Sequence, residues 1–168
     1  KIHRTTFEKL KIEKSYDLVL FSESFQYVSI KDSLIKIPLL LNENGKLLIC
    51  DFFRQPGTGT KPLGGGHDWN VFQDNLKNHS FTNLIDIDIT TETARTYDLI
   101  NILVKDVAAP VRDLSSSYLS SQYPKGMKFL KWYFEKKISR MNRIYFSGNM
   151  TGEMFNKLKT YRILLYKV

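Results

Sequence analysis

The chain of 168 residues has very little cysteine and no long apolar run, and both absences exclude classes of protein. Its one cysteine, Cys50, allows no internal disulfide, which excludes a disulfide-stabilised secreted fold and fits a reducing compartment. The longest apolar stretches, such as residues 37–41, are far shorter than the roughly 18 residues that a membrane-spanning helix needs. The first residues also lack the apolar segment of a secretory signal. We therefore expect a soluble, cytoplasmic protein without a transmembrane segment.

What the chain does have is an ordinary globular composition with a very uneven distribution of charge. Hydrophobic residues make up 42% and charged residues 25%, which is typical of a packed domain. The formal net charge is +8, yet residues 1–123 hold 14 Lys and Arg against 15 Asp and Glu. Residues 124–168 hold 11 against 2, and most of this excess lies in residues 124–145. The positive charge is therefore a property of this segment and not of the whole surface, and any acidic partner would meet the chain there.

The apolar pattern of residues 16–51 predicts a strand–helix–strand unit. Residues 16–21 form a continuous apolar run, typical of a strand that is buried on both faces of a parallel sheet. Residues 29–41 place apolar side chains at helical spacing, and residues 42–45 end in a glycine that is typical of a turn. Residues 46–51 then form a second apolar run, which we expect to be the neighbouring strand.

The same alternation continues along the rest of the chain. The expected elements are a glycine-rich loop at 55–66, a short helix at 68–78, a strand at 81–89, a long helical region at 92–145 with a serine-rich interruption at 115–121 and a break at Pro124, and a last strand at 161–166. Alternating strands and helices predict an open α/β sheet, in which ligands bind outside the carboxyl ends of the strands. We therefore expect the functional site at residues 22–28 and 51–68.

Two blocks of the sequence resemble the fourth and fifth strands of class I S-adenosylmethionine-dependent methyltransferases. Residues 16–28 read YDLVLFSESFQYV, which is similar to the family's "fDlV" and the loop after it that touches cofactor and substrate. Residues 39–53 read LLLNENGKLLICDFF, which is similar to the family's "LkpgGrlli.D". Residues 81–84 resemble the entry to strand six, although Ser80 stands where the family usually has Gly, and residues 161–167 resemble the last, antiparallel strand.

The resemblance implies a fold, a cofactor and a substrate class. The fold would be a partial Rossmann-like methyltransferase sheet with strands equivalent to 4, 5, 7 and 6. Residues 1–91 and 151–168 would form the C-terminal half of the methyltransferase core, and residues 92–150 a helical insertion or lid. The cofactor would be S-adenosylmethionine, and the methyl acceptor a small molecule.

One part of the family pattern is absent from these 168 residues. The Gly-x-Gly-x-Gly cofactor loop and the acidic residue that binds the ribose belong upstream of the matching blocks. Residues 64–66 are all glycine but cannot replace that loop, because they follow the fifth-strand equivalent. The family strand that pairs beside Val19 is absent too, so we expect the open sheet edge to pair with an N-terminal portion or with a second copy as a homodimer.

The candidate site residues follow the two predicted strands. His67 is the preferred catalytic base, because it follows three glycines and because an imidazole with a pKa near ~6.5 suits proton transfer at neutral pH. An exposed loop histidine, or one bonded to Asp68, is the alternative. Glu23 is the second catalytic candidate. The alternative for this region is that its polar residues only cap the following helix, with Ser24 or Ser29 as the N-cap.

Further contacts are implied by the resemblance. The cofactor-binding candidates are Ser22, Glu23, Ser24, Gln26, Tyr27 and Thr6, where Thr6 takes the place of a family Asp that contacts the adenine. The substrate-binding candidates are Asp51, Phe53, His67, Tyr123 and Trp132. No metal is expected, because Asp51, His67 and Asp68 lack the regular spacing of a metal site.

Residues 124–145 have a pattern that admits two interpretations. Their apolar residues recur every three or four positions, so a helix over this segment would have one apolar and one cationic face. It could be a lid over the active site, or it could recruit an acidic partner: RNA, an anionic lipid surface or an acyl-carrier protein. Nucleic acid is not favoured, because no RNA-binding motif is present. The alternative to an enzyme is a non-catalytic binding or dimerisation module.

Overall fold

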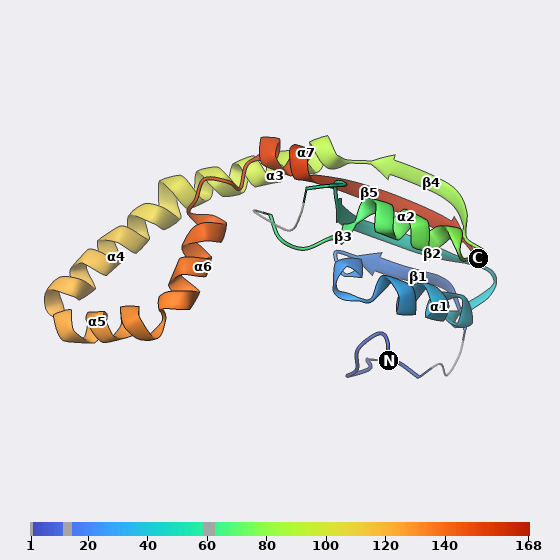
Figure 1. The fold of residues 1–168 in the computed structure, drawn as a ribbon, viewed down its shortest axis with the longest axis horizontal. Coiled ribbons are helices and arrows are strands. Elements are labelled where there is room, and N and C mark those ends of the chain that lie inside the picture. The colour runs from blue at the N-terminus through green and yellow to red at the C-terminus, as the bar shows by residue number, and fades with distance from the viewer. Residues whose placement is uncertain (1, 12–14, 59–62) are drawn as a thin grey trace. The chain divides into compact units, whose positions relative to one another are not determined.

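The computed structural model describes residues 2–11, 15–58 and 63–168, which form two compact units. Unit 1 comprises Lys1–Thr90 with Lys157–Val168, and unit 2 comprises Thr91–Asn156. Unit 1 contains the sheet and two helices, and unit 2 is helical (Figure 1).

The sheet of unit 1 has the strand order that the resemblance implies. Its four longer strands are β1 (Tyr16–Ser22), β2 (Leu41–Arg54), β4 (Thr82–Asp88) and β5 (Lys159–Lys167), in the order β1-β2-β5-β4. β1 is parallel to β2, whereas β5 is antiparallel to both β2 and β4. The predicted order 4, 5, 7, 6 with an antiparallel last strand is therefore confirmed. The sequence pattern did not predict β3 (His67–Asp68), a short strand that pairs with Phe53 and Arg54 of β2.

Polar side chains define where the helices of unit 1 begin. Helix α1 (Ile30–Leu40) follows the cap Ser29, whose hydroxyl oxygen accepts a hydrogen bond from Asp32 N at 3.4 Å. Helix α2 (Trp69–Lys77) follows the cap Asp68, whose carboxylate accepts bonds from two backbone amides of the first turn. A 3-10 turn, η1 (Phe25–Tyr27), connects β1 to α1. Capping by Ser29, the structural alternative for this region, is confirmed.

The hydrophobic core of unit 1 lies between one face of the sheet and helices α1 and α2 (Figure 1). Three fully buried phenylalanine rings form its centre: Phe72 lies 5.4 Å from Phe25 and 4.9 Å from Phe53 between ring centroids. Burial of each such side chain contributes about 1.5 to 3 kcal/mol. The pairing of β1 with β2 and these rings therefore fix the loops that follow both strands.

The opposite face of the sheet is largely uncovered within the described residues. Leu18 and Leu20 of β1 are 47% and 55% exposed, and Ile85 and Ile87 of β4 are also exposed. The prediction that the first strand is buried on both faces is therefore wrong. The reason is that α1 and α2 both pack on the other face, where Phe21 is buried.

The predicted turn at residues 42–45 lies inside β2. Tyr16 pairs with Leu41 but Leu18 pairs with Lys46, so the register shifts and residues 42–45 form an irregular, bulged part of the strand. Asn44 has a φ of 63°, a left-handed conformation that Asn tolerates better than most residues. The pattern at residues 42–45 thus correctly predicted a turn-like backbone. The predicted start of the strand at residue 46 was wrong, because β2 begins at Leu41.

Unit 2 consists of consecutive helical segments. They are α3 (Thr90–Leu103), a π-helical turn η2 (Val104–Ala108), α4 (Ala109–Gln122), α5 (Pro124–Tyr133), α6 (Glu135–Tyr145) and α7 (Gly152–Leu158), with the first residue of α3 and the last two of α7 belonging to unit 1. The break at Pro124 is confirmed. Within the described ranges, none of the helices is long and apolar enough to cross a membrane.

Two predictions for unit 2 are corrected. Residues 115–121 do not interrupt the helix but lie inside α4, because serine hydroxyls can bond to the helix's own carbonyls, as Ser121 Oγ does to Tyr118 O at 2.7 Å. Residues 124–145 form two helices instead of one, because the backbone leaves the helical conformation at Phe134. The apolar pattern runs through this break and therefore did not reveal it.

Candidate functional site

The segment that follows β1 meets the last residues of β2 at one edge of the sheet, which we call the carboxyl edge. Gln26 N donates to Asp51 Oδ2 at 3.1 Å, and Gln26 Nε2 donates to Asp51 Oδ1 at 3.3 Å. Glu23 N donates to the carbonyl oxygen of Cys50 at 2.9 Å. The adjacency of residues 22–28 and 51–67, predicted from the two parallel strands, is thus confirmed for their described residues; residues 59–62 lie outside the described residues.

A carboxylate, a phenol and a thiol are joined by hydrogen bonds at this edge. Tyr161 OH donates a hydrogen bond to Glu23 Oε1, and Cys50 Sγ donates to Tyr161 OH at 3.7 Å. Burial, together with the neighbouring Glu23 carboxylate, raises the pKa of the Tyr161 phenol well above its ordinary value. Tyr161 therefore stays protonated at neutral pH and remains a hydrogen-bond donor to Glu23. Glu23 itself has a φ of 52°, in the left-handed region that is costly for a residue other than glycine.

A buried lysine holds the glycine loop against the same edge. Lys159 is 2% exposed, and its Nζ donates to Gly65 O at 2.6 Å and to Gly64 O at 3.3 Å. The ammonium also lies 5.0 Å from the centroid of the Phe52 ring. Burial and the nearby positive charge of Arg54 lower the pKa of Lys159 to about 8.

The glycines in this loop are required by close backbone contacts. Gly65 has a φ of 78°, and a Cβ atom at this position would lie 2.6 Å from Gln26 Oε1. Gly66 has a φ of 75°, and its carbonyl oxygen accepts a hydrogen bond from Arg54 Nε at 3.0 Å. The positive φ at both positions, and a Cβ at Gly66 that would lie 2.9 Å from the carbonyl oxygen of Phe52, explain why glycine stands at 65 and 66.

Neither Tyr161 nor Lys159 was identified from the sequence. Both lie at the start of β5, which runs antiparallel to β2, so that Tyr161 pairs with Phe52 and Lys159 with Arg54. The antiparallel last strand was expected, and it could have revealed both residues. The first residues of such a strand necessarily lie beside the carboxyl end of its parallel neighbour.

Two of the substrate-binding candidates are buried inside unit 1. Asp51 is almost completely buried, and desolvation raises the pKa of its carboxyl, with the charge of Glu23 adding to this effect, while backbone hydrogen bonds from Gln26 and Phe52 oppose it. Phe53 belongs to the core and lies 5.0 Å from the Trp69 ring. In this conformation neither side chain reaches solvent.

His67, the preferred base, lies in β3 against η1. Its Nε2 is 3.0 Å from the carbonyl oxygen of Phe25, and its ring lies edge-on to the Phe25 ring at 5.4 Å. The imidazole therefore connects β3 to the turn after β1. The hydrogen bond to a carbonyl requires the proton on Nε2 in the neutral ring.

The remaining candidates are exposed, with the exception of Gln26. Ser22, Ser24 and Tyr27 present their side chains to solvent after β1, whereas Gln26 is half-buried by its bonds to Asp51. Thr6 is exposed in the segment before β1, next to Phe7, whose ring packs edge-on against Phe21 at 5.1 Å. Tyr123 and Trp132 are exposed on unit 2. Over the described residues, no group of three or more His, Cys, Asp or Glu side chains is arranged to hold a metal ion.

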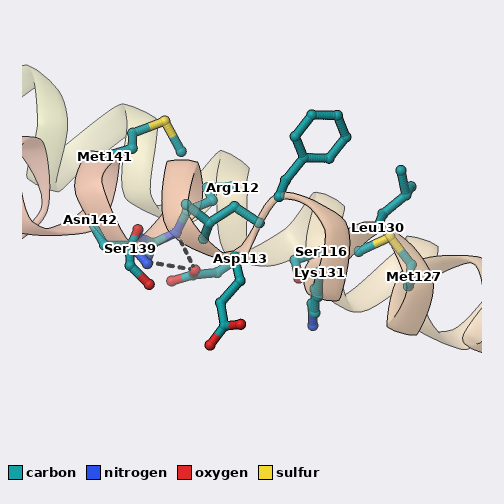
Figure 2. A pocket seen from close by; sticks show the side chains of 12 residues that line it. Arg112, Asp113, Ser116, Met127, Leu130, Lys131, Ser139, Met141 and Asn142 are labelled. Carbon is teal, nitrogen blue, oxygen red and sulfur yellow. Dashed lines mark hydrogen bonds and ion pairs between the residues drawn. The ribbon is translucent and has the colours of Figure 1, made fainter.

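A separate groove of about 790 Å³ lies within unit 2, between helices α4, α5 and α6 (Figure 2). Its apolar lining comes mainly from Met127, Leu130, Phe134, Ile138 and Met141. Arg112 of α4 forms an ion pair with Asp113 at 2.8 Å and donates to Asn142 of α6 at 3.4 Å. Because the groove is lined by one unit alone, it is distinct from the carboxyl edge.

The comparisons with known proteins rest on structure and not on sequence. No protein-family model matches the chain, and a search of curated proteins finds no match. Three similar solved structures are a protein assigned as a sarcosine dimethylglycine methyltransferase from Galdieria sulphuraria (13% identity, TM-score 0.57), a geranyl diphosphate methyltransferase in complex with GPP and sinefungin (11%, 0.58), and an O-MT segment of StiE (14%, 0.55).

The matches cover 97%, 95% and 95% of this chain but only 57%, 50% and 46% of the three structures. The chain thus spans about half the length of the methyltransferases it resembles. At these identities the likeness concerns the fold. Together with the order β1-β2-β5-β4 and the antiparallel β5, it identifies the chain as having the Rossmann-like fold of part of a class I methyltransferase, with strands equivalent to 4, 5, 7 and 6.

Proposed function

We propose that this chain forms the acceptor side of an S-adenosylmethionine-dependent methyltransferase that acts on a small molecule. The observation that carries the proposal is the carboxyl edge, where residues 22–28 meet Asp51 and His67. The structural neighbours support the substrate class, because two of them are named for small molecules, sarcosine dimethylglycine and geranyl diphosphate. One neighbour was solved with sinefungin, an analogue of the cofactor.

The residues after β1 fit one side of such a cofactor. Ser22, Glu23 and Ser24 are consecutive residues, and all three are exposed. The carboxylate of Glu23 complements a ligand that carries sulfonium and ammonium charges. Bound there, the cofactor would supply an electrophilic methyl group. The described residues contain no glycine-rich loop that opens a β-α unit, so they would form only one side of the cofactor site. Tyr27 and Thr6 are proposed to extend this side.

Glu23 is the group best placed to handle a proton of the acceptor. The Tyr161 hydroxyl fixes Glu23 Oε1, and no hydrogen bond within the described residues occupies Oε2. A carboxylate held in one orientation can accept the proton of an acceptor hydroxyl or amine while the methyl group is transferred. His67 is proposed as the second proton acceptor. Its use would require the Nε2 bond to the Phe25 carbonyl to break or the other ring nitrogen to act.

The remaining candidates of unit 1 are proposed to support the acceptor pocket from within the core. Asp51 would act indirectly, because its carboxylate holds Gln26 beside Gly65. Phe53 would also act indirectly, because its buried ring fixes the end of β2, from which the glycine-rich loop begins.

The open edge of β1 is proposed to pair with additional polypeptide. Within the described residues β1 has β2 as its one strand neighbour, and its outer face carries the exposed Leu18 and Leu20. Unpaired backbone groups beside apolar side chains are a site of association. Either a further portion of the same protein or a second copy would complete the sheet. Analytical ultracentrifugation over a range of concentrations distinguishes the two, because self-association alone makes the mass concentration-dependent.

Calorimetry with S-adenosylmethionine and S-adenosylhomocysteine tests the cofactor assignment. We expect weak binding to the wild-type chain and about tenfold weaker binding to Glu23→Gln, because a hydrogen bond to a charged group contributes about 1.5 to 3 kcal/mol. Glu43→Gln is the matched control, since Glu43 is exposed in the bulge at the opposite end of β2. No binding by the wild type would contradict the proposal and favour a non-catalytic module. Equal binding by Glu23→Gln would remove Glu23 from the site.

A further inference from the structure

Helix α5 has two different faces, and only one of them packs within unit 2. The inner face carries Met127 and Leu130, which line the groove against α4 and α6 (Figure 2). The other face, which we call the α5 outer face, carries Lys125, Lys128, Phe129 and Trp132. These four residues have the spacing i, i+3, i+4 and i+7 of a single helix face and line a shallow hollow of about 380 Å³.

The aromatic side chains of the α5 outer face form one exposed apolar patch. Phe129 is 59% and Trp132 70% exposed, and the adjoining Tyr133 is exposed to a similar extent. The Phe129 ring lies 5.9 Å from the Trp132 ring and 6.1 Å from the Tyr133 ring. Single exposed apolar residues are common, but a contiguous group of large aromatic rings marks a surface that binds something apolar.

The two helices α5 and α6 carry a strongly positive charge. Helices α5 and α6 carry seven basic residues and one acidic residue, Glu135; the basic residues are Lys125, Lys128, Lys131, Lys136, Lys137, Arg140 and Arg143. Among the residues that the structure describes, none of these seven cations forms an ion pair. Their charge is therefore available to an anionic partner, and two of them, Lys125 and Lys128, line the same hollow as Phe129 and Trp132.

We propose that unit 2 docks on an anionic lipid bilayer through the α5 outer face. Trp and Tyr rings prefer the boundary between headgroups and acyl chains, and a helix with aromatic residues beside lysines is typical of segments that lie in this boundary. The lysine stems extend along the apolar surface while their ammonium groups reach the headgroup phosphates. Helix α5 has 10 residues, so it lies on the bilayer and does not cross it.

A bilayer explains this surface better than a nucleic acid does. Proteins that bind single strands combine stacking rings with a basic groove that follows the backbone over several nucleotides. On α5 the rings pack against one another, which leaves fewer ring faces for bases, and the hollow at this face involves four residues of one short helix. Binding to RNA is the competing outcome that the experiment must distinguish.

Vesicle co-sedimentation of the full chain tests the proposal. Vesicles of phosphatidylcholine alone are compared with vesicles that contain about one third phosphatidylserine, at low and high salt. We expect binding to the anionic vesicles only, with salt weakening it because exposed charges are screened. Lys125→Gln/Lys128→Gln is expected to reduce the partition coefficient about 25-fold, at about fivefold for each basic residue lost.

Three further variants separate the contributions of charge and aromatic surface. Phe129→Ser/Trp132→Ser is expected to lower the partition coefficient at least about tenfold at unchanged net charge. Lys31→Gln/Lys46→Gln removes two exposed charges from unit 1 and should change binding less than about twofold. Leu114→Ser removes an exposed apolar residue of α4 and should also have little effect. Circular dichroism of each variant verifies that the helices are intact.

Fluorescence gives a second measurement that does not depend on sedimentation. In a Trp69→Phe variant the tryptophan emission comes from Trp132 alone, and insertion of its ring into the headgroup boundary should shift that emission to shorter wavelength. Equal binding to neutral vesicles, no binding to anionic vesicles, or full binding by the α5 variants would overturn the proposal. So would tighter binding to a single-stranded RNA oligonucleotide that the same α5 variants abolish.

Discussion

Replacing Lys159 by Met is expected to remove a pH-dependent part of the free energy of unfolding. Burial and the charge of Arg54 lower the pKa of Lys159 to about 8, whereas the ordinary value is 10.5. Between these two pH values the unfolded chain binds a proton that the folded chain has released. The free energy of unfolding therefore rises with pH in this window, because stability increases with pH wherever the unfolded state binds more protons.

The magnitude follows from the width of the window. From pH 8 to pH 10 the folded amine is largely neutral and the unfolded amine is largely charged, and each tenfold change in this proton equilibrium corresponds to about 1.4 kcal/mol. Lys159 should thus contribute about 2 to 3 kcal/mol more to stability at pH 10 than at pH 7. Below pH 8 both states are protonated, so the desolvated ammonium is then at its most costly.

Urea unfolding monitored by far-ultraviolet circular dichroism measures this effect. The difference in free energy of unfolding between the wild type and Lys159→Met should change by the stated amount from pH 7 to pH 10, with the wild type gaining. Lys167→Met is the control, because Lys167 is exposed at the other end of β5 and should show no such change. If the wild type and Lys159→Met differ in free energy of unfolding by the same amount at both pH values, the buried position of the amine is refuted.

Two other substitutions test contacts at the same edge and at a helix terminus. Asp68→Ala should lower the free energy of unfolding by about 1 kcal/mol, because it removes the cap of α2. The control is Asp74→Ala, which should lower it by less than about 0.5 kcal/mol, because the Asp74 carboxylate pairs with an exposed lysine. Tyr161→Phe should cost about 1 to 2 kcal/mol through loss of the hydrogen bond to Glu23, while Tyr118→Phe on the surface of α4 should be neutral. Urea titrations measure both pairs, and equal effects within a pair would contradict the assigned contacts.

The sequence predicted those parts of the fold that depend on local apolar pattern. The runs at 16–21 and 46–51 became β1 and β2, and helix spacing placed α1 and α2 within one or two residues. The pattern failed where tertiary contacts decide. It could not extend β2 to Arg54 or reveal β3, because these depend on pairing with distant residues. It also could not reveal which sheet face the helices leave uncovered.

The candidate site shows the same division between local and distant information. Residues 22–28 could be located because they follow a recognisable strand. Glu23 was a candidate from the start, yet its hydrogen-bond partner Tyr161 lies 138 positions away along the chain. The burial of Asp51 and Phe53 was also hidden, because polar and aromatic residues at a strand end look alike whether they face solvent or the core.

The uncovered sheet face has a practical consequence for handling this protein. Leu18 and Leu20, together with the exposed isoleucines of β4, present apolar surface while the chain is fully folded. Dyes that fluoresce on contact with such surface would therefore give a high signal before any heating. A molecule that binds these side chains in the native state alone would raise the melting temperature. Because the dye signal is already high before heating, this increase is better measured from intrinsic signals than from a dye.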